Sequence, residues 1–173
     1  AIPPFGIVAV GVHVNVLVHL ADGLHVWIAL RAAAKLLDPG KLDHVTAGGV
    51  PAGLTPEQTL VKEAEEEAAI PPALSAQARR VAIIDYAMER PEGLRRDRLH
   101  CYDLDLPDDF VPQATDGEVA GFELWPITRV LQTVRDTDDF KFNVNLVLID
   151  LFLRLGLIPE AAAVDVRAAL FAD

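Results

Sequence analysis

The sequence predicts one α+β domain, a mixed α/β/α sandwich in which helices flank a mixed central β-sheet. Strands are expected first, then a helix, more strands and a final set of helices, an order that suits a layered domain. The length of 173 residues is enough for one domain with its own core. Hydrophobic residues make up 51% of the chain and charged residues 24%, which is the composition of a folded protein.

The first strands are predicted from residues that alternate between two faces. Apolar residues occupy every second position from Val12 to Leu20, and again within His25–Arg31. Because the turn residues Ala21-Asp22-Gly23 lie between these runs, the runs predict a β-hairpin. We expect a loop over Leu36–Leu42, and then a short strand, Val45–Gly49, that leads into a glycine-rich bend.

A helix is predicted to begin at Thr55-Pro56-Glu57-Gln58. Thr55 is expected as the N-cap, Pro56 suits the first helical position, and Gln58 completes a capping-box pattern. The helix is expected to run to about Ala69, because Pro71-Pro72 cannot continue it.

The remaining elements are predicted from strand-like runs and then from helical periodicity. The predicted strands are Arg80–Ala87, Leu99–Leu106 and Val119–Trp125, with a turn at Arg90–Gly93. Three helices are expected to follow, at Pro126–Arg135, Asn143–Leu155 and Pro159–Phe171, with Gly156 as a C-cap.

Composition excludes several classes of function. The chain has 26 acidic and 15 basic residues, a net charge of −11. An acidic surface repels nucleic-acid phosphates and attracts metal cations, so no nucleic-acid partner is expected. Ser75 is the only serine, which argues against a serine hydrolase, and the only cysteine, Cys101, cannot form an intrachain disulfide.

The apolar stretch Phe5–Leu20 is predicted as a strand and not as a membrane span. It contains His13, Asn15 and His19, its period is two, and no basic leader precedes it. We therefore expect no membrane partner and a cytoplasmic location. The chain begins with Ala1 and not Met, as a piece of a longer protein would.

The candidate chemistry lies on the first helix. Glu63, Glu66 and Glu67 fall within roughly a 100° arc of one helix face. Like charges at these spacings destabilise a helix by about 0.2–0.5 kcal/mol per pair, which a hard cation such as Mg²⁺ would offset. The alternative is a solvated helix face, which is the expected role of Glu65.

The bend before this helix strengthens the metal-site hypothesis. Gly48, Gly49 and Gly53 let the backbone approach an ion or a phosphate closely. The bend is not a Walker loop, because no Gly-Lys-[Ser/Thr] follows, and its spacing differs from the dinucleotide-binding fingerprint.

Residues 48–70 resemble the box of the Nudix family, G-x5-E-x7-R-E-U-x-E-E-x-G-U, where U is apolar. With the first glycine at Gly48, the Arg-Glu pair falls on Lys62-Glu63 and the Glu-Glu pair on Glu66-Glu67. The chain departs from the box at Leu54, where the box has Glu, and at Ala69, where it has Gly. The resemblance implies a Nudix fold for a single domain, 1–173.

Other stretches resemble one Nudix branch, in which the domain is sometimes fused to thiamine pyrophosphokinase. These include GVHVN, VWIALR, PGKLDHVTAGG and FKFNVNLVLIDLFLRLG, and the similarity covers roughly residues 5–157. The branch implies hydrolysis of thiamine diphosphate, or its oxidised analogues such as oxythiamine diphosphate, to the monophosphate and phosphate. It also implies a tolerated apolar residue at Leu54 and a further domain upstream.

The resemblance assigns roles to individual residues. Mg²⁺ or Mn²⁺ would be held by Glu63, Glu66 and Glu67 with the carbonyl of Gly48, and these ions would activate water. Glu66, Glu67 and Glu118 are the catalytic candidates, with Glu118 as the base or an extra ligand. The candidates for binding a small-molecule diphosphate are Arg31, Lys35, Arg95, Arg96 and Lys141, and for stacking on its ring, Tyr86 and Trp27.

Histidines and asparagines are given no catalytic role. His13 and His19 are too far apart on one strand to share a metal, and His19 and His25 are expected to pair across the hairpin. No histidine is assigned to zinc. Asn143 and Asn145 suit either a helix cap or a supporting position in the site.

Several alternatives stay open. One is a hydrolase of another nucleoside diphosphate derivative such as ADP-ribose, and another is a non-catalytic Nudix-fold binding module. An isopentenyl diphosphate isomerase is disfavoured, because Cys101 lacks the surrounding motif. Nudix domains are often dimers, so a homodimer is also open.

Overall fold

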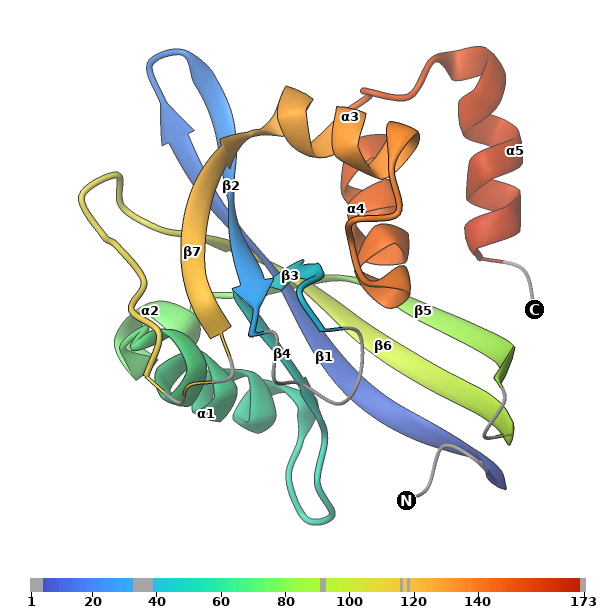
Figure 1. The fold of residues 1–173 in the computed structure, drawn as a ribbon, viewed down its shortest axis with the longest axis horizontal. Coiled ribbons are helices and arrows are strands. Elements are labelled where there is room, and N and C mark those ends of the chain that lie inside the picture. Colours follow the sequence, from blue (N-terminus) through green and yellow to red (C-terminus); the bar gives the residue numbers. More distant parts are fainter. Residues whose placement is uncertain (1–4, 33–38, 91–92, 116, 118, 172–173) are drawn as a thin grey trace.

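The computed structural model describes residues 5–32, 39–90, 93–115, 117 and 119–171. A curved mixed sheet forms its middle layer, and helices cover both faces of that sheet (Figure 1). The predicted α+β sandwich is therefore confirmed. Among the described helices, none is both long and apolar enough to cross a membrane.

Seven strands make up the sheet. Its path runs β3-β2-β1-β6-β5, while β4 pairs with β1 and β7 pairs with β2. The strands are β1 (Phe5–Leu20), β2 (Gly23–Arg31), β3 (Leu42–His44), β4 (Thr46–Gly49), β5 (Arg79–Arg90), β6 (Gly93–Asp105) and β7 (Val119–Pro126).

Two helices lie between β4 and β5, and three follow β7 at the carboxyl end of the chain. They are α1 (Pro56–Ala68), α2 (Pro72–Ser75), α3 (Ile127–Asp136), α4 (Phe142–Arg154) and α5 (Glu160–Leu170). The predicted helices are confirmed to within two residues at most ends. Gly156 has a positive φ of 66° just after α4, as expected of a residue that stops a helix.

β1 organises the sheet. It pairs in parallel with β6 and antiparallel with β2, which returns from the turn after Leu20. Towards its amino-terminal half β1 leaves β2 and pairs with β4, from Gly11↔Gly49 to Val14↔Thr46. The glycine-rich end of β4 therefore lies beside the middle of β1.

Alternation along β1 separates the two cores of the molecule. Val12, Val14 and Val16 pack with Leu60 and Ala64 of α1. Leu17, one residue out of step, packs instead with residues of α4 on the other face. Odd-numbered residues of β1, including His13 and Asn15, consequently face α4.

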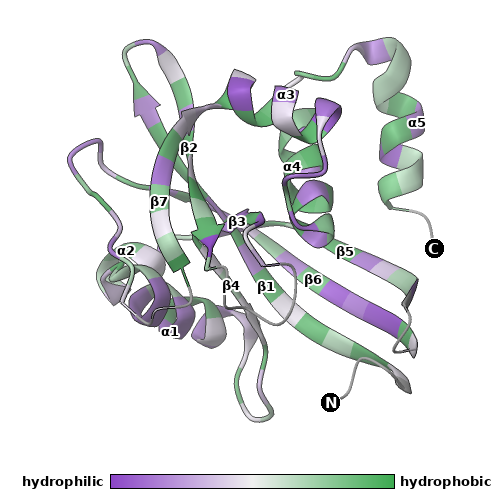
Figure 2. Ribbon diagram, viewed as in Figure 1, coloured by the Kyte–Doolittle hydropathy of each residue, from purple (hydrophilic) through white to green (hydrophobic). Residues whose placement is uncertain are grey.

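The hairpin of β5 and β6 extends well beyond its predicted ends. Pairing continues from Arg79↔Asp103 to Arg90↔Gly93, whereas the predicted strands omitted the charged ends. Figure 2 shows this hydrophilic stretch of β6 beside hydrophobic residues of β1. The stretch lacks clear apolar alternation, so its strand structure depends on cross-strand pairing, which no local pattern reveals.

Candidate functional site

The site begins at the cap of α1, which has the predicted form. The Thr55 hydroxyl accepts a hydrogen bond from the Gln58 backbone N–H at 3.2 Å, and the Gln58 side chain accepts one from the Thr55 N–H at 2.9 Å. Leu60, Ala64 and Ala68 are buried against the sheet. This fixes the rotation of the helix, so that the face with Glu63 and Glu67 lies next to β4.

Glu63 lies directly against Gly48. A Cβ atom added to Gly48 would be 2.8 Å from Cδ and 2.9 Å from Oε2 of Glu63. These distances are shorter than real Cβ contacts allow, so only glycine at position 48 leaves room for this carboxylate. The first glycine of the box and its first helical glutamate thus form one structural unit.

The other two box glutamates are held in different ways. Glu67 Oε2 accepts a hydrogen bond from the Ala47 N–H at 3.1 Å, which ties α1 to β4. Glu66 is more exposed, and its Oε2 is 2.5 Å from Nζ of Lys62. That hydrogen bond is the main cause that raises the pKa of the Lys62 ammonium. The Thr115 hydroxyl donates to the Glu66 carbonyl.

The end of α1 shows what the box glycine would do. Ala69 has φ 53° and ψ 30°, the left-handed conformation that glycine adopts without strain. Its N–H donates to the Glu65 carbonyl at 3.1 Å, and the Ile70 N–H donates to the Ala64 carbonyl at 3.0 Å. The first of these is the 5→1 bond of an αL helix end, here with alanine in the position that glycine usually occupies.

The oxygen atoms at this edge are of the chemical type that a hard divalent cation binds. Three carboxylates and the neighbouring backbone of Gly48 offer the oxygen donors that Mg²⁺ or Mn²⁺ prefers, and the space that a Gly48 Cβ would fill is taken up by Glu63. Glu63, Glu66 and Glu67 are the residues that would hold such an ion.

A pocket of about 170 Å³ lies on the α4 face of the sheet and reaches Gly48 and Gly49. Ala9, Gly11 and His13 of β1 form part of its lining, because alternate residues of a strand share a face. Asp97 and Leu99 of β6 continue that surface, because they pair in register with β1. The rest of the lining includes Arg95, Lys141 and Asn143. Gly48 therefore belongs both to this pocket and to the glutamate cluster.

Two of the predicted phosphate-binding cations share one carboxylate. Asp43 is buried, and its Oδ2 lies 2.7 Å from Nη1 of Arg31 and 3.4 Å from Nζ of Lys141. These cations hold the pKa of Asp43 below its usual value although burial raises it. Lys141 lines the 170 Å³ pocket, whereas Arg31 does not.

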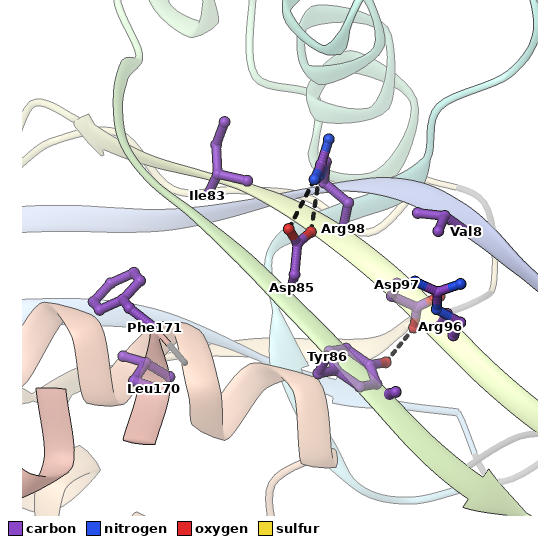
Figure 3. Close-up of a pocket in the computed structure, with 10 residues that line it drawn as sticks. Val8, Ile83, Asp85, Tyr86, Arg96, Asp97, Arg98, Leu170 and Phe171 are labelled. Carbon is purple, nitrogen blue, oxygen red and sulfur yellow. Dashed lines mark hydrogen bonds and ion pairs between the residues drawn. The ribbon is translucent and has the colours of Figure 1, made fainter. Parts of the chain in front are cut away.

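Arg95 and Tyr86 meet at a second buried carboxylate. Arg95 Nε lies 2.6 Å from Oδ2 of Asp97. The Tyr86 hydroxyl donates to the same oxygen, a contact that Figure 3 shows. Tyr86, Asp97 and Arg96 line a larger cavity of about 470 Å³ between β5, β6 and the end of α5. Trp27, the other predicted ring-stacking residue, lines neither pocket and packs in the core beside α1.

Behind the pocket, a buried chain of hydrogen bonds determines the tautomers of two histidines. Asn15 donates from Nδ2 to Asp103 at 2.9 Å, so its oxygen accepts from Nε2 of His44 at 3.0 Å. The unprotonated Nδ1 of His44 then accepts from Nδ1–H of His13 at 3.1 Å. The Nε2 atom of His13 is left to accept from the Asn143 amide at 3.2 Å.

Both of these imidazoles are neutral. Burial lowers the pKa of His13 well below its usual value and that of His44 to about 4. Ligand atoms of His13, His44 and Asp43 lie within 4.8 Å of one another. The hydrogen bonds account for both histidines without an ion, and Arg31 and Lys141 make the surroundings unfavourable for a dication.

The structure contradicts two expectations, one about a histidine pair and one about a helix cap. His19 and His25 do not pair, because the two-residue turn sets His19 opposite Leu24 and His25 opposite Val18. Instead His19 lies 3.2 Å from Asp105, and His25 contacts the Gly23 carbonyl. Asn143 is not a helix cap, since it lies inside α4 and supports His13.

The structure adds residues to the site and leaves two undescribed. Lys35 and Glu118 lie outside the described residues. Asp43, Asp97, His13 and His44 were not predicted. For Asp97 a signal existed, because it occupies the same strand face as the apolar residues Leu99 and Cys101, where a charged side chain needs a partner or a ligand.

Sequence comparisons identify relatives of the whole fold. A family model described as NUDIX domain matches residues 11–145. The chain is 45% identical over 162 residues to "Nudix hydrolase 24, chloroplastic" and 44% identical over 163 residues to "Nudix hydrolase 20, chloroplastic", both of Arabidopsis thaliana. The alignments cover 93% and 94% of this chain but 44% of each relative. The chain thus spans less than half the length of either protein.

A solved structure shows the same fold. The NUDIX domain of Shewanella oneidensis NrtR, complexed with ADP ribose, matches with a TM-score of 0.65 at 17% identity, over 84% of this chain and 87% of that chain. The family match covers most of the chain, and residues 48–70 carry three of the four box glutamates. The chain belongs to the NUDIX domain family.

Proposed function

We propose that this domain is a Mg²⁺- or Mn²⁺-dependent hydrolase of small organic diphosphates. The observation that carries the proposal is the double role of Gly48, which seats the carboxylate of Glu63 and also lines the 170 Å³ pocket. A diphosphate in that pocket would lie between the glutamate cluster and the cations Arg95 and Lys141. In a protein of net charge −11, this local positive charge favours an anionic ligand.

The chain's own residues would divide the work of hydrolysis. A bound divalent cation would neutralise phosphate charge and lower the pKa of water. Glu63, Glu66 and Glu67 would hold that cation, while Lys141 and Arg95 would bind phosphate oxygens. A bond forms between phosphorus and the oxygen of water, and the bond between phosphorus and the bridging oxygen breaks. A carboxylate takes the proton from the attacking water. Glu118 stays our candidate for that carboxylate.

For the organic group we propose thiamine diphosphate or its oxidised analogues, converted to the monophosphate and phosphate. The support is the resemblance of the chain to the Nudix branch associated with thiamine pyrophosphokinase. Tyr86 would contribute an aromatic face for the cationic ring, because it lines the cavity next to the pocket. ADP-ribose is the second candidate, favoured by the ADP ribose in the Shewanella oneidensis complex.

The arrangement of the full protein is also a proposal. Residues 1–173 would form one hydrolase domain, joined to an upstream domain in a longer protein, and a homodimer is proposed for its assembly. The relatives' length supports the longer protein, since this chain matches 44% of each. The cytoplasmic location stays a prediction, which the chloroplastic names of these relatives do not support.

The experiment is a substrate panel with product identification. The protein is incubated with Mg²⁺ and thiamine diphosphate, oxythiamine diphosphate, ADP-ribose or a nucleoside triphosphate, and products are identified by mass spectrometry. Monophosphate release from the thiamine compounds would support the proposal. Turnover of ADP-ribose alone would keep the hydrolase and discard the thiamine substrate. No turnover with Mg²⁺ or Mn²⁺ would favour a non-catalytic binding module.

A further inference from the structure

We propose that Asp97 recognises the organic group of the substrate by accepting a hydrogen bond from its N–H. This inference rests on the proposed function, because it concerns the same site, and it adds the chemistry that selects the substrate. The ligand class is a diphosphate whose organic part carries an amino group or a ring N–H that can reach Asp97 when the diphosphate lies near Gly48 and Lys141.

Asp97 is a buried carboxylate with one oxygen left over. It is 5% exposed, so its desolvation must be offset by partners. Both of its protein partners, Arg95 Nε and the Tyr86 hydroxyl, donate to Oδ2. Among the described residues, none donates a hydrogen bond to Oδ1. This oxygen also keeps some contact with solvent, because it is not one of the fully shielded atoms that lack a partner.

Asp97 lines both cavities. It lines the 170 Å³ pocket together with Gly48 and Lys141, and it lines the 470 Å³ cavity together with Tyr86. Figure 3 shows Tyr86 and Asp97 approaching each other across β5 and β6. A substrate with its diphosphate near Gly48 and Lys141 would therefore bring its organic group to Asp97.

The chemistry of a carboxylate determines what it selects. A carboxylate oxygen only accepts hydrogen bonds, so a ligand group that also only accepts would be repelled. A site that offers a buried hydrogen-bonding group rejects ligands that leave it unpaired more strongly than a purely apolar site does. The pyrimidine amino group of thiamine diphosphate provides such an N–H.

The substitution Asp97→Asn tests the acceptor at nearly constant shape. Because Arg95 and Tyr86 are donors, they would hold the amide oxygen at the Oδ2 position, and the amide NH₂ would replace Oδ1. We expect KM for thiamine diphosphate to rise at least tenfold. The inhibition constant of inorganic pyrophosphate, which has no organic group, should change less than twofold. Asp105→Asn, an exposed carboxylate at the far end of β6, is the control and should change neither.

A ligand change gives the same comparison in the unaltered protein, whether or not Asp97→Asn folds. A thiamine diphosphate analogue with hydrogen in place of the pyrimidine amino group should show KM raised about tenfold in wild type. In a folded Asp97→Asn variant the two ligands should differ less than threefold. Equal changes in KM and in pyrophosphate inhibition, or equal KM for the two ligands in wild type, would overturn the inference and leave the proposed hydrolase intact. A wild-type protein that hydrolyses no diphosphate would overturn both.

Discussion

Gly48 is the residue that lets the carboxylate of Glu63 lie beside β4. A methyl group at this position would be within 2.9 Å of three Glu63 side-chain atoms, so Gly48→Ala should displace that carboxylate. We expect Mn²⁺ affinity to fall at least tenfold, with little change in the melting temperature because Glu63 is not part of the apolar core. Isothermal titration calorimetry with Mn²⁺ measures the affinity.

The neighbouring glycine provides the matched control. A Cβ at Gly49 would meet no atom within 4 Å, so Gly49→Ala should leave Mn²⁺ affinity within about twofold of wild type. The two variants add the same methyl group to adjacent positions of β4. Equal Mn²⁺ affinity for Gly48→Ala and wild type would show that the seat of Glu63 has no part in metal binding.

Ala69 carries strain that glycine would remove. Its φ of 53° makes it the one non-glycine residue with positive φ among those described, a conformation that costs an L-residue about 1 kcal/mol. Ala69→Gly should therefore raise the free energy of unfolding by about 0.5–1 kcal/mol, although the added flexibility of the unfolded chain offsets part of the gain.

Urea denaturation of Ala68→Gly gives the opposite comparison. Ala68 is the last helical residue and is fully buried, so glycine there should lower the free energy of unfolding by about 1 kcal/mol or more. Changes of the same sign in both variants would contradict the assignment of strain to Ala69.

At the scale of the element, α1 depends on its capping box. Thr55→Ala removes the hydroxyl that accepts from the Gln58 N–H, and such changes cost about 0.5–2 kcal/mol. Thr55→Ser keeps a hydroxyl and should lose less than half as much. Urea unfolding curves measure both. If serine and alanine were equally destabilising, the side-chain cap would not be what stabilises this helix start.

Local signals explain why α1 could be predicted and the pocket could not. The cap, the glutamate spacing and the end of the helix all lie within residues 55–70, so each could be inferred from neighbours in sequence. The pocket surface depends instead on Ala9 lying opposite Asp97 and on Gly11 lying opposite Gly49. These registers join segments far apart in the chain, and no nearby residues specify them.

The histidines show the same limit. The alternation of β1 predicted a strand through His13, but His44 and Asn143 reach it from β3 and α4. Lys62 at the arginine position of the box could be recognised from sequence, whereas its contact with Glu66 requires side-chain geometry. Sequence therefore predicted which helix carries the glutamates, and the fold added which carboxylates and cations line the pocket.

At the scale of the whole molecule, the buried histidines make stability depend on pH. Burial has the largest effect on His44 and lowers its pKa to about 4. The neighbouring Lys141 lowers this pKa further, whereas Asp43 and Asp103 favour the charged form and offset only part of the effect. Burial and the adjacent His44 and Lys141 likewise lower the pKa of His13. Between pH 4 and 6.5 the unfolded chain binds more protons than the folded one, so stability falls as pH falls through this range.

Urea unfolding at pH 7, 6 and 5 tests this dependence. We expect the free energy of unfolding to fall by up to about 1.4 kcal/mol per pH unit for each of the two histidines once pH is below 6.5. His44→Gln should reduce this slope, and His19→Gln, at an exposed position, should not. A wild-type protein equally stable at pH 7 and 5 would show that folding does not lower the pKa of these histidines.

The most direct measurement is phosphate release from thiamine diphosphate as a function of Mg²⁺ concentration in wild type, Glu66→Gln and Glu65→Gln. The last two change neighbouring exposed glutamates of one helix, only one of which belongs to the proposed metal-binding face. We expect Mg²⁺-dependent release of phosphate in wild type and Glu65→Gln, and a loss of at least 100-fold in Glu66→Gln. Equal rates in the two variants, or release that does not depend on a divalent cation, would contradict the role of this glutamate cluster.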